Sequence, residues 1–360
     1  MANTTAATGL TPEQWDSKFF KQYIQGNAFS RYMGSSENNI IQVKEDLTKK
    51  RGDALHFALV NRLVGAGVSG SSTLVGNEEE MKSRSHKLTV DQVRNAVVVP
   101  DFEEQKSSIA LRDAAKSVLM DWAMEETRDR IIAELLSING VAYGTASEAQ
   151  KDAWLVDNAD RVLFGAAKAN NASNDHSAAL LQIDNTADKL TSGALSLMKR
   201  IATSANPKIR PVRLDGDKRF YIAFAGPQTF RDLKTDTTIT QAQREVSIVM
   251  QNNKLFDGGD VHWDGIIVHE VDDITPIAGV GAGGIDVSPV YLCGAQALGV
   301  GYAKRWQTTT DVTDYGDKNG VGIRAWYDVD KMTFGSGSAD TDDLKDHGVV
   351  TGYFAAVADS

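Results

Sequence analysis

A single long helical pattern follows Pro100 in this sequence. Asp101 with Glu104 three residues later is typical of a capping box, and Asn139-Gly140 supplies a stop signal. Apolar residues recur between these points at helical spacing, which predicts a helix over residues 101–138. If continuous, it is roughly 50 Å long at 1.5 Å per residue. Such a length is unusual in a compact enzyme domain.

Two strand patterns precede this helix. Partial alternation in "ALHFALVNRL" and "HKLTVDQVRNAVVV" predicts two strands, separated by a Gly/Ser stretch and the acidic segment "GNEEE". Connections longer than about a dozen residues between strands are usually functional or mobile, so we predict a long protruding hairpin over residues 54–100. Glu78, Glu79 and Glu80 are expected on a solvated or inter-subunit face, because consecutive acids point in different directions and do not favour a cation site.

A second helical pattern lies near the N-terminus. Thr11 is a candidate N-cap with Pro12 at the first helical position, and Trp15, Phe19 and Tyr23 follow at a spacing of four. This aromatic stripe predicts either packing against its own domain or an arm that docks on a neighbouring subunit. The sequence leaves both interpretations open.

Strands and helices are mixed beyond residue 205. The segment "RFYIAFAGPQTFRDLKTD" predicts a strand, a turn at Gly226-Pro227 and a helix. Further strands are expected in "HWDGIIVHEV", in "VYLCGAQAL" and near the C-terminus. The chain is therefore expected to belong to the α+β class.

The composition narrows the possible functions. The 360 residues are 42% apolar, enough for a sizeable core, and their formal charge of −10 argues against a main role in gripping a phosphate backbone. The single cysteine, Cys293, excludes an intramolecular disulfide framework. The N-terminus lacks a secretory signal pattern, and the apolar stretch around Cys293 is too short and glycine-rich to span a bilayer. We expect a cytosolic chain without membrane contact.

Histidines and acids gather in "GGDVHWDGIIVHE", residues 258–270. Asp264-Gly265 predicts a two-residue hairpin turn, and strand alternation would then place Asp260, His262 and His269 on one face. A metal-dependent enzyme using these three residues is one alternative. Two surface imidazoles on a hairpin is the favoured interpretation, because a diagonal histidine pair is too widely spaced for one zinc ion and no HExxH or CxxC supports a site. No nucleophile elbow or phosphate-binding loop occurs, so neither catalytic residues nor a cofactor are expected.

An arm, a protruding hairpin and a very long helix together suggest assembly, since their apolar faces need partners. Five segments carry a resemblance in chain order: "IIQVKEDLTKKRGDALHFALVNRLVGAGVSGSSTLVGNEE", "DFEEQKSSIALRDAAKSVLMDW", "RVLFGAAK", "YIAFAGPQTFRDLKTD" and "VHWDGIIVHE". They are similar to the major capsid proteins of N4-like tailed phages and their relatives. The resemblance covers most of the chain from about Thr11 and implies the HK97-like capsid fold.

The resemblance also implies a domain organisation. Residues 1–53 would form the N-terminal arm and 54–100 the extended loop. Residues 101–205 would form the peripheral domain, with the spine helix at 101–138. Residues 206–300 would form the axial domain, and 301–360 would return as strands to the peripheral domain.

The implied function is mechanical. Copies would associate as hexamers and pentamers, self-assemble into an icosahedral shell in the host bacterial cytoplasm, and enclose double-stranded DNA in the virion. The extended loop would lie over a neighbouring subunit and the arm would clasp another. Contact with the DNA would be weak and non-specific, because the chain is net negative.

Other partners follow from the same resemblance. Few residues precede the first expected helix, so a separate scaffolding protein is expected, together with a portal protein and possible cement (decoration) proteins. An encapsulin-like nanocompartment shell is the alternative within the same fold.

Overall fold

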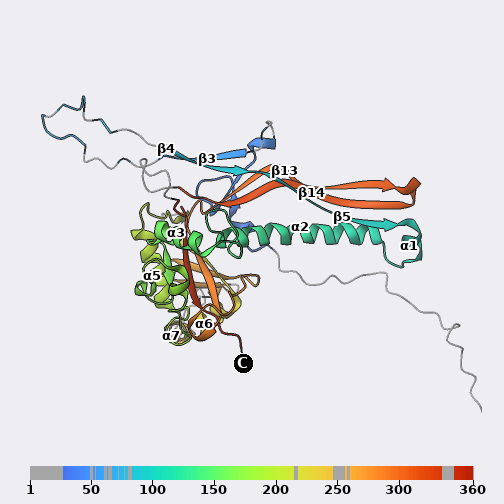
Figure 1. The fold of residues 1–360 in the computed structure, drawn as a ribbon. Coiled ribbons are helices and arrows are strands. Elements are labelled where there is room, and N and C mark those ends of the chain that lie inside the picture. The colour runs from blue at the N-terminus through green and yellow to red at the C-terminus, as the bar shows by residue number, and fades with distance from the viewer. Residues whose placement is uncertain are drawn as a thin grey trace, which may run out of the picture.

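The computed structural model describes residues 27–48, 52, 54–60, 63, 67–71, 73–76, 78–79, 83–214, 218–245, 256–257, 260–334 and 344–359. Within these residues the chain forms a five-stranded sheet, an eight-stranded sheet and a separate two-stranded hairpin (Figure 1). The helices are distributed over both larger sheets, as expected of an α+β protein.

The five-stranded sheet extends into a long projection away from the body of the molecule (Figure 1). We call this projection the arm; the N-terminal arm is a different segment and keeps its full name. Strands β1, β2 and β13 are parallel to one another, and β13, β14 and β5 are antiparallel. Because β2 pairs with β13 only over Leu298–Gly301, the far part of the arm is three-stranded. The strand order is β1 (Met33–Gly34), β2 (Ile41–Lys44), β13 (Leu298–Thr313), β14 (Lys318–Lys331) and β5 (Asp91–Pro100).

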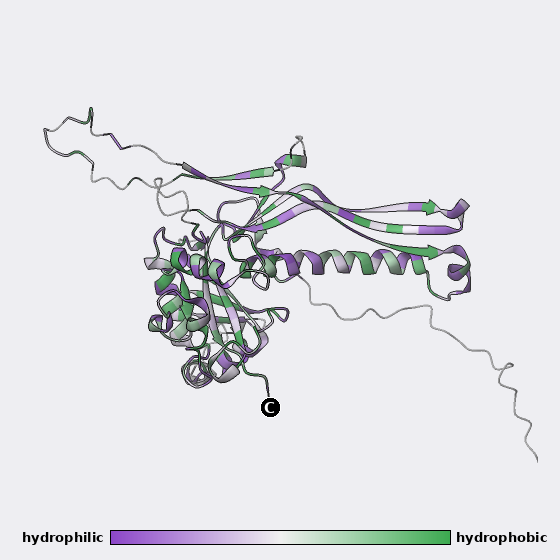
Figure 2. Ribbon diagram, in the orientation of Figure 1, coloured by the Kyte–Doolittle hydropathy of each residue, from purple (hydrophilic) through white to green (hydrophobic). Residues whose placement is uncertain are grey.

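Two helices accompany this arm, α1 (Asp101–Lys106) and α2 (Leu111–Leu136). Leu119 and Ala123 of α2 pack against Val321 and Ile323 of β14, because all four side chains are buried in one cluster. Figure 2 shows hydrophobic and hydrophilic residues alternating around α2, as its amphipathic pattern requires.

The helix predicted over residues 101–138 is interrupted. Residues 107–110 leave the helical conformation and separate α1 from α2. The predicted capping box at Asp101 is wrong: Pro100 occupies the N-cap, and no side-chain cap is present. Since β5 runs into α1 through Pro100, Asp101 already lies inside the helix, and its carboxylate accepts a hydrogen bond from the Asn319 amide at 2.7 Å.

The separate hairpin consists of β3 (Ala54–Val60) and β4 (Ser83–Thr89). Its antiparallel register sets Val60 opposite Ser83, so a strand pair is present, but the second strand predicted over residues 86–99 divides at Val90 into β4 and β5. The range 54–100 also contained β5, which pairs instead with β14 along its whole length. The hairpin therefore ends at Thr89.

The eight-stranded sheet forms the body of the molecule. Helices α5 (Ser192–Ser204), α6 (Pro227–Thr235) and α7 (Thr237–Glu245) contribute to the core on one of its faces. Helices α3 (Glu148–Asn158) and α4 (His176–Leu180) pack near its β6–β15 end. The strand order is β6 (Val162–Phe164), β15 (Val349–Ala355), β12 (Val287–Cys293), β8 (Lys218–Ala225), β11 (Ile266–Glu270), β10 (Asp260–Trp263) and β9 (Phe256–Asp257), with β7 (Val212–Leu214) paired to β8.

Local signals in this body are confirmed. Asp264 and Gly265 both have positive φ, as a two-residue hairpin turn requires, and the register of β10 and β11 pairs Trp263 with Ile266. Pro227 lies in the first turn of α6, as the turn at Gly226-Pro227 predicted. None of the described helices is long and apolar enough to cross a membrane.

The two sheets cut across the ranges inferred from the resemblance. In the range 101–205, α1 and α2 accompany the five-stranded sheet, whereas α3, β6, α4 and α5 belong with the eight-stranded sheet. In the range 301–360, β14 lies in the arm, but β15 pairs with β12 over seven residues inside the body. This pairing joins residues far apart in sequence, so no local pattern shows it.

A buried polar joint connects the two sheets. Lys331 at the end of β14 forms a 2.9 Å ion pair with Asp346, which precedes β15, and both side chains are 2% exposed. The Lys331 ammonium also donates to the Ser137 carbonyl beyond α2, at 2.8 Å. The Trp154 indole of α3 donates to the same Asp346 carboxylate at 3.3 Å. We call these four residues the buried joint.

Candidate assembly surfaces

The root of the β3–β4 hairpin is packed against two glycines of β13. A Cβ at Gly301 would lie 2.5 Å from Leu55 Cδ1 and 2.8 Å from Leu88 Cδ2. A Cβ at Gly299 would lie 2.9 Å from Phe57 Cζ. These distances are below van der Waals contact, so only glycine leaves room for the hairpin side chains. We call Gly299 and Gly301 the glycine socket.

Polar contacts fix the same root. The Lys44 ammonium donates to the His56 carbonyl at 2.9 Å and lies 4.6 Å from the centre of the Phe57 ring. On the other strand, His86 Nε2 is 2.9 Å from the Asp330 carboxylate of β14. The hairpin is therefore held to the sheet by both of its strands.

The far part of the hairpin presents apolar and acidic side chains to solvent. Glu78 and Glu79 are exposed, as predicted for a solvated face, whereas Glu80 lies outside the described residues. An apolar group between 57% and 79% exposed is a surface that a partner can bury. These apolar residues are Val60, Leu63, Leu74 and Val75.

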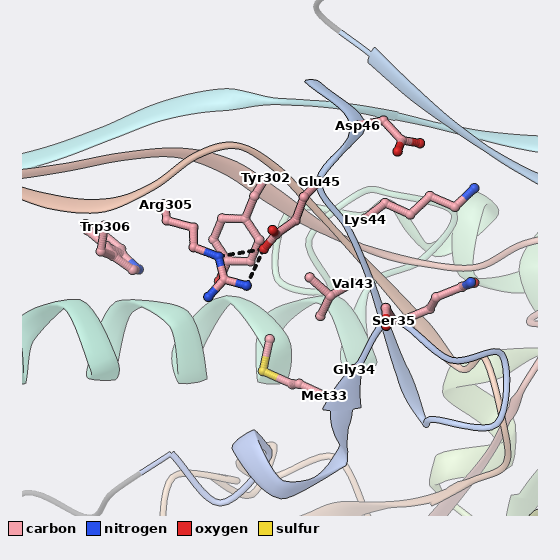
Figure 3. A pocket seen from close by; sticks show the side chains of 11 residues that line it. Met33, Gly34, Ser35, Val43, Lys44, Glu45, Asp46, Tyr302, Arg305 and Trp306 are labelled. Carbon is pink, nitrogen blue, oxygen red and sulfur yellow. Dashed lines mark hydrogen bonds and ion pairs between the residues drawn. The ribbon is translucent and has the colours of Figure 1, made fainter. Parts of the chain in front are cut away.

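A groove of about 850 Å³ opens beside β1, β2 and the bulged part of β13 (Figure 3). Figure 3 shows the Arg305 guanidinium reaching Glu45 across it, and Arg305 Nε donates to Glu45 Oε1 at 2.6 Å. The remaining lining side chains are partly apolar, such as Met33 and Val43, and partly polar, such as Ser35 and Lys44. This combination of apolar and hydrogen-bonding groups is typical of protein–protein contacts. Trp15, Phe19 and Tyr23 lie outside the described residues, so their docking stays a prediction.

Two of the three residues of the metal alternative are in contact. His269 Nδ1 lies 2.5 Å from Asp260 Oδ1, and its Nε2 faces the Tyr32 hydroxyl. Burial lowers the pKa of His269, against the pull of Asp260, and burial raises the pKa of Tyr32 to about 12. His269 thus links the body to the segment around Tyr32, and it is buried rather than the surface imidazole that we expected. His262 is half-buried on β10.

Within the described ranges, one group of acids is close enough together to hold a metal ion. Asp260, His262 and His269 are not members of this group. The group consists of Glu148, Asp152 and Asp175. Glu148 and Asp152 accept the backbone N–H groups of Ser177 and His176, both at 2.8 Å, and Asp175 is the side-chain N-cap of α4. Helix capping accounts for this cluster.

The glycine socket and the groove were not predicted from the sequence. The socket did have a signal, since "LGVGYA" places two glycines at alternate positions and therefore on one face of a strand. The groove had none, because β1, β2 and β13 come together only through long-range pairing.

Comparisons with known proteins identify the family of this chain. The family model described as "Phage capsid protein" matches residues 3–358. The major capsid protein of Pseudomonas phage KPP25 is 27% identical over 387 residues, with 98% of each chain covered.

Solved structures match the whole chain. The capsid asymmetric unit of cyanophage Pam1 has a TM-score of 0.87 at 32% identity, with both chains fully covered. The capsid of Ralstonia phage GP4 has a TM-score of 0.77 at 21% identity, again with both chains fully covered.

These matches support the capsid fold, and they support neither the nanocompartment nor the metal-enzyme alternative. The narrower N4-like assignment is not confirmed by them. A structural protein family also favours a function without catalysis. The chain belongs to the phage capsid protein family, has the HK97-like capsid fold, and functions as a phage major capsid protein.

Proposed function

We propose that copies of this chain associate as hexamers and pentamers and tile an icosahedral shell around double-stranded DNA. The observation that carries this proposal is the β3–β4 hairpin. Its root fills the glycine socket, whereas Leu63, Leu74 and Val75 in its far part are exposed. Apolar surface that one copy leaves open is expected to be covered by another. The hairpin therefore lies over a neighbouring subunit.

The two sheets correspond to the two domains of the shell subunit. The five-stranded sheet with α1 and α2 is the peripheral domain, and the eight-stranded sheet with its helices is the axial domain. Support comes from the burial of Leu119 and Ala123 against the arm, separate from the core that α5 and α6 share with the body. Residues 1–53 act as the N-terminal arm, whose strands β1 and β2 join the five-stranded sheet.

The remaining partners rest on the resemblance. A separate scaffolding protein guides assembly in the host cytoplasm, a portal protein occupies one vertex, and cement proteins bind outside. Contact with packaged DNA is weak, since the net charge of −10 repels a phosphate backbone.

Shortening the hairpin tests the proposal. Val60 and Ser83 are directly opposite, so an Asn-Gly turn can replace residues 61–82 without disturbing the root. We expect a folded subunit with an unchanged thermal midpoint and at least about tenfold fewer shells, because the apolar contact between copies is lost. Sedimentation and negative-stain electron microscopy measure the shells.

Point variants separate this effect from shortening as such. Leu74→Ser with Val75→Ser should also lower the shell yield. The matched control, Val156→Ser with Leu181→Ser, removes two apolar residues of the body that are more than half exposed, and it should leave the yield near that of the wild type. Normal shells from the shortened variant would refute the role assigned to the hairpin.

A further inference from the structure

The far part of the arm has one face that α2 does not cover. Val321 and Ile323 of β14 point toward α2, so the alternate residues of β14 point away from it. On this outer face, Gly320 and Gly322 lie opposite Val98 and Ala96 of β5. Because both of these β14 residues are glycines, the centre of the face is flat along β14.

Two arginines meet at the inner end of this flat area. Arg94 of β5 and Arg324 of β14 are directly opposite each other in the antiparallel register. Like charges in this position repel and destabilise a sheet. Within the part of the chain that the structure describes, neither guanidinium forms an ion pair, and Arg324 Nε is buried without a hydrogen-bond partner. An external anion would offset the repulsion between the two arginines and would accept a hydrogen bond from the unsatisfied Arg324 Nε.

Neighbouring side chains extend the positive face. Lys304 of β13 lies opposite Trp326, with its ammonium 5.3 Å from the centre of a Trp326 ring that is 41% exposed. Acids occur toward both ends of this surface, with Asp311 opposite Gly320 and Asp91 opposite Tyr327. We call this surface the basic strip; it consists of Arg94, Lys304 and Arg324 beside Ala96, Gly320 and Gly322.

We infer that the basic strip of one copy receives the acidic part of the β3–β4 hairpin, Glu78 and Glu79, from a second copy. Both residues are exposed beside the exposed Leu74 and Val75, and Glu78 Oε2 accepts a hydrogen bond from the Gly76 N–H at 2.7 Å. Charge complementarity favours this occupant, because the segment that contains the two acids is negative and the two adjacent arginines are positive. The flat floor admits a chain lying on the sheet.

A second copy is required for geometric reasons. Figure 1 shows the hairpin and the far end of β13 and β14 pointing away from each other, so the two surfaces of one chain do not meet. A contact between different surfaces of identical chains is head-to-tail, and such contacts form rings when the rotation between copies closes. The inference rests on the proposed shell function and names the surface that the hairpin covers.

A phosphate backbone is the other polyanion that arginines attract, and it fits the strip less well. Only three basic side chains form the strip, Asp311 lies at its edge, and the chain is net negative at −10. Strong binding of nucleic acid draws on a larger set of phosphate contacts.

A charge swap in the full chain tests the inference. Arg94→Glu with Arg324→Glu, and separately Glu78→Lys with Glu79→Lys, should each lower the shell yield at least about tenfold, and the four substitutions together should restore most of it. Arg200→Glu with Lys208→Glu is the matched control, since both residues are exposed on the body, and it should assemble normally. Shells are counted by sedimentation and electron microscopy.

A second variant guards against misfolding. Arg94→Gln with Arg324→Gln removes the cross-strand repulsion without adding a charge, so the thermal midpoint of the free subunit should rise while the shell yield falls. A lower midpoint with an unchanged shell yield would overturn the inference.

The outcomes distinguish a failure of the basic strip from a failure of the shell function. Failure of the four substitutions to restore assembly, while wild-type shells form, overturns the strip and leaves the shell function intact. Normal shells from the arginine variant that hold less DNA overturn it in favour of a nucleic-acid contact. Absence of any particle from the wild-type chain, both alone and together with a scaffolding protein, contradicts the proposed function itself.

Discussion

Glu134 of α2 is an acid whose surroundings oppose its charge. Burial raises the pKa of its carboxyl from 4.5 to about 7, and the charge of Asp330 adds to the effect. The Ser137 hydroxyl and the Lys331 ammonium act in the opposite direction without cancelling it. One oxygen of the carboxylate, Oε2, is buried without a hydrogen-bond partner. The ionised carboxylate of Glu134 is therefore less stable in the folded subunit than the protonated carboxyl.

Replacing Glu134 by Gln should stabilise the subunit at high pH only. Because the pKa is raised in the folded chain, the stabilisation from proton binding is complete below pH 4.5 and is lost as the pH rises through about 7. Glutamine cannot ionise, so we expect a gain on the order of 1–2 kcal/mol at pH 8 and almost none at pH 4.5, allowing for partial solvent screening. Thermal midpoints at both pH values measure it. The exposed Glu103→Gln is the control, and an equal gain at both pH values would argue against a titrating Glu134.

At the scale of the element, the β3–β4 hairpin can pack on β13 because two residues of β13 are glycines and have no side chains there. Leu55, Phe57 and Leu88 occupy space that side chains at Gly299 and Gly301 would fill. The cluster around Phe57 and Leu88 is small, with Met332 and Phe334 as its other buried members. A small cluster gives way more easily than the cores of the two larger sheets, so an intrusion there moves the hairpin first.

Gly301→Val should loosen the hairpin and leave the rest of the fold intact. The new side chain overlaps Leu55 and Leu88, with an overpacking cost of about 1–3 kcal/mol. Hydrogen exchange should become faster for the amides of β3 and β4 and stay unchanged for β12 and β15. Gly144→Val is the control, because a Cβ there would have no neighbour within 4 Å. Unchanged exchange in β3 and β4 would show that the socket does not hold the hairpin.

Sequence patterns predicted the elements whose signals are local. The Asp264-Gly265 turn, the paired strands β3 and β4, and most of the long helix have such signals, and the structure contains all three. The interruption at 107–110 was missed because "KSSIA" contains no glycine or proline to mark it. The placement of β5 and β15 was missed for another reason: strand partners are chosen by long-range packing, and their sequences would suit either sheet.

The same limit applies to the candidate surfaces. Consecutive acids at Glu78 and Glu79 are visible in the sequence, but their proposed counterpart is not. Arg94 and Arg324 are 230 residues apart and become neighbours only through the register of β5 and β14. Charge patterns reveal one side of an interface when that side is a continuous segment. The other side is assembled from several strands, so it can be identified only when the fold is known.

For the whole molecule, the important question is how the arm is held to the body. The core cluster that contains Ile131 and Leu135 of α2 also contains Phe224 of the body and Val300 of the arm, so apolar packing crosses the junction. Apolar packing alone tolerates small rotations, whereas a buried ion pair has a narrow range of geometry. The Lys331–Asp346 pair of the buried joint is therefore placed to fix the angle between the two sheets, and in a closed shell that angle sets the curvature.

Lys331→Met should test both the stability and the angle. It leaves the Asp346 carboxylate buried with the Trp154 indole as its remaining side-chain donor, so we expect a loss of about 3–5 kcal/mol and a lower thermal midpoint. Adding Asp346→Leu should recover part of that stability, because no uncompensated charge remains, yet shells from the double variant should vary more in diameter by electron microscopy. Lys116→Met, which removes an exposed pair with Asp113, should cost less than about 1 kcal/mol and keep the diameter uniform. A uniform diameter in the double variant would mean that apolar packing alone fixes the angle, and the joint would then contribute only to stability.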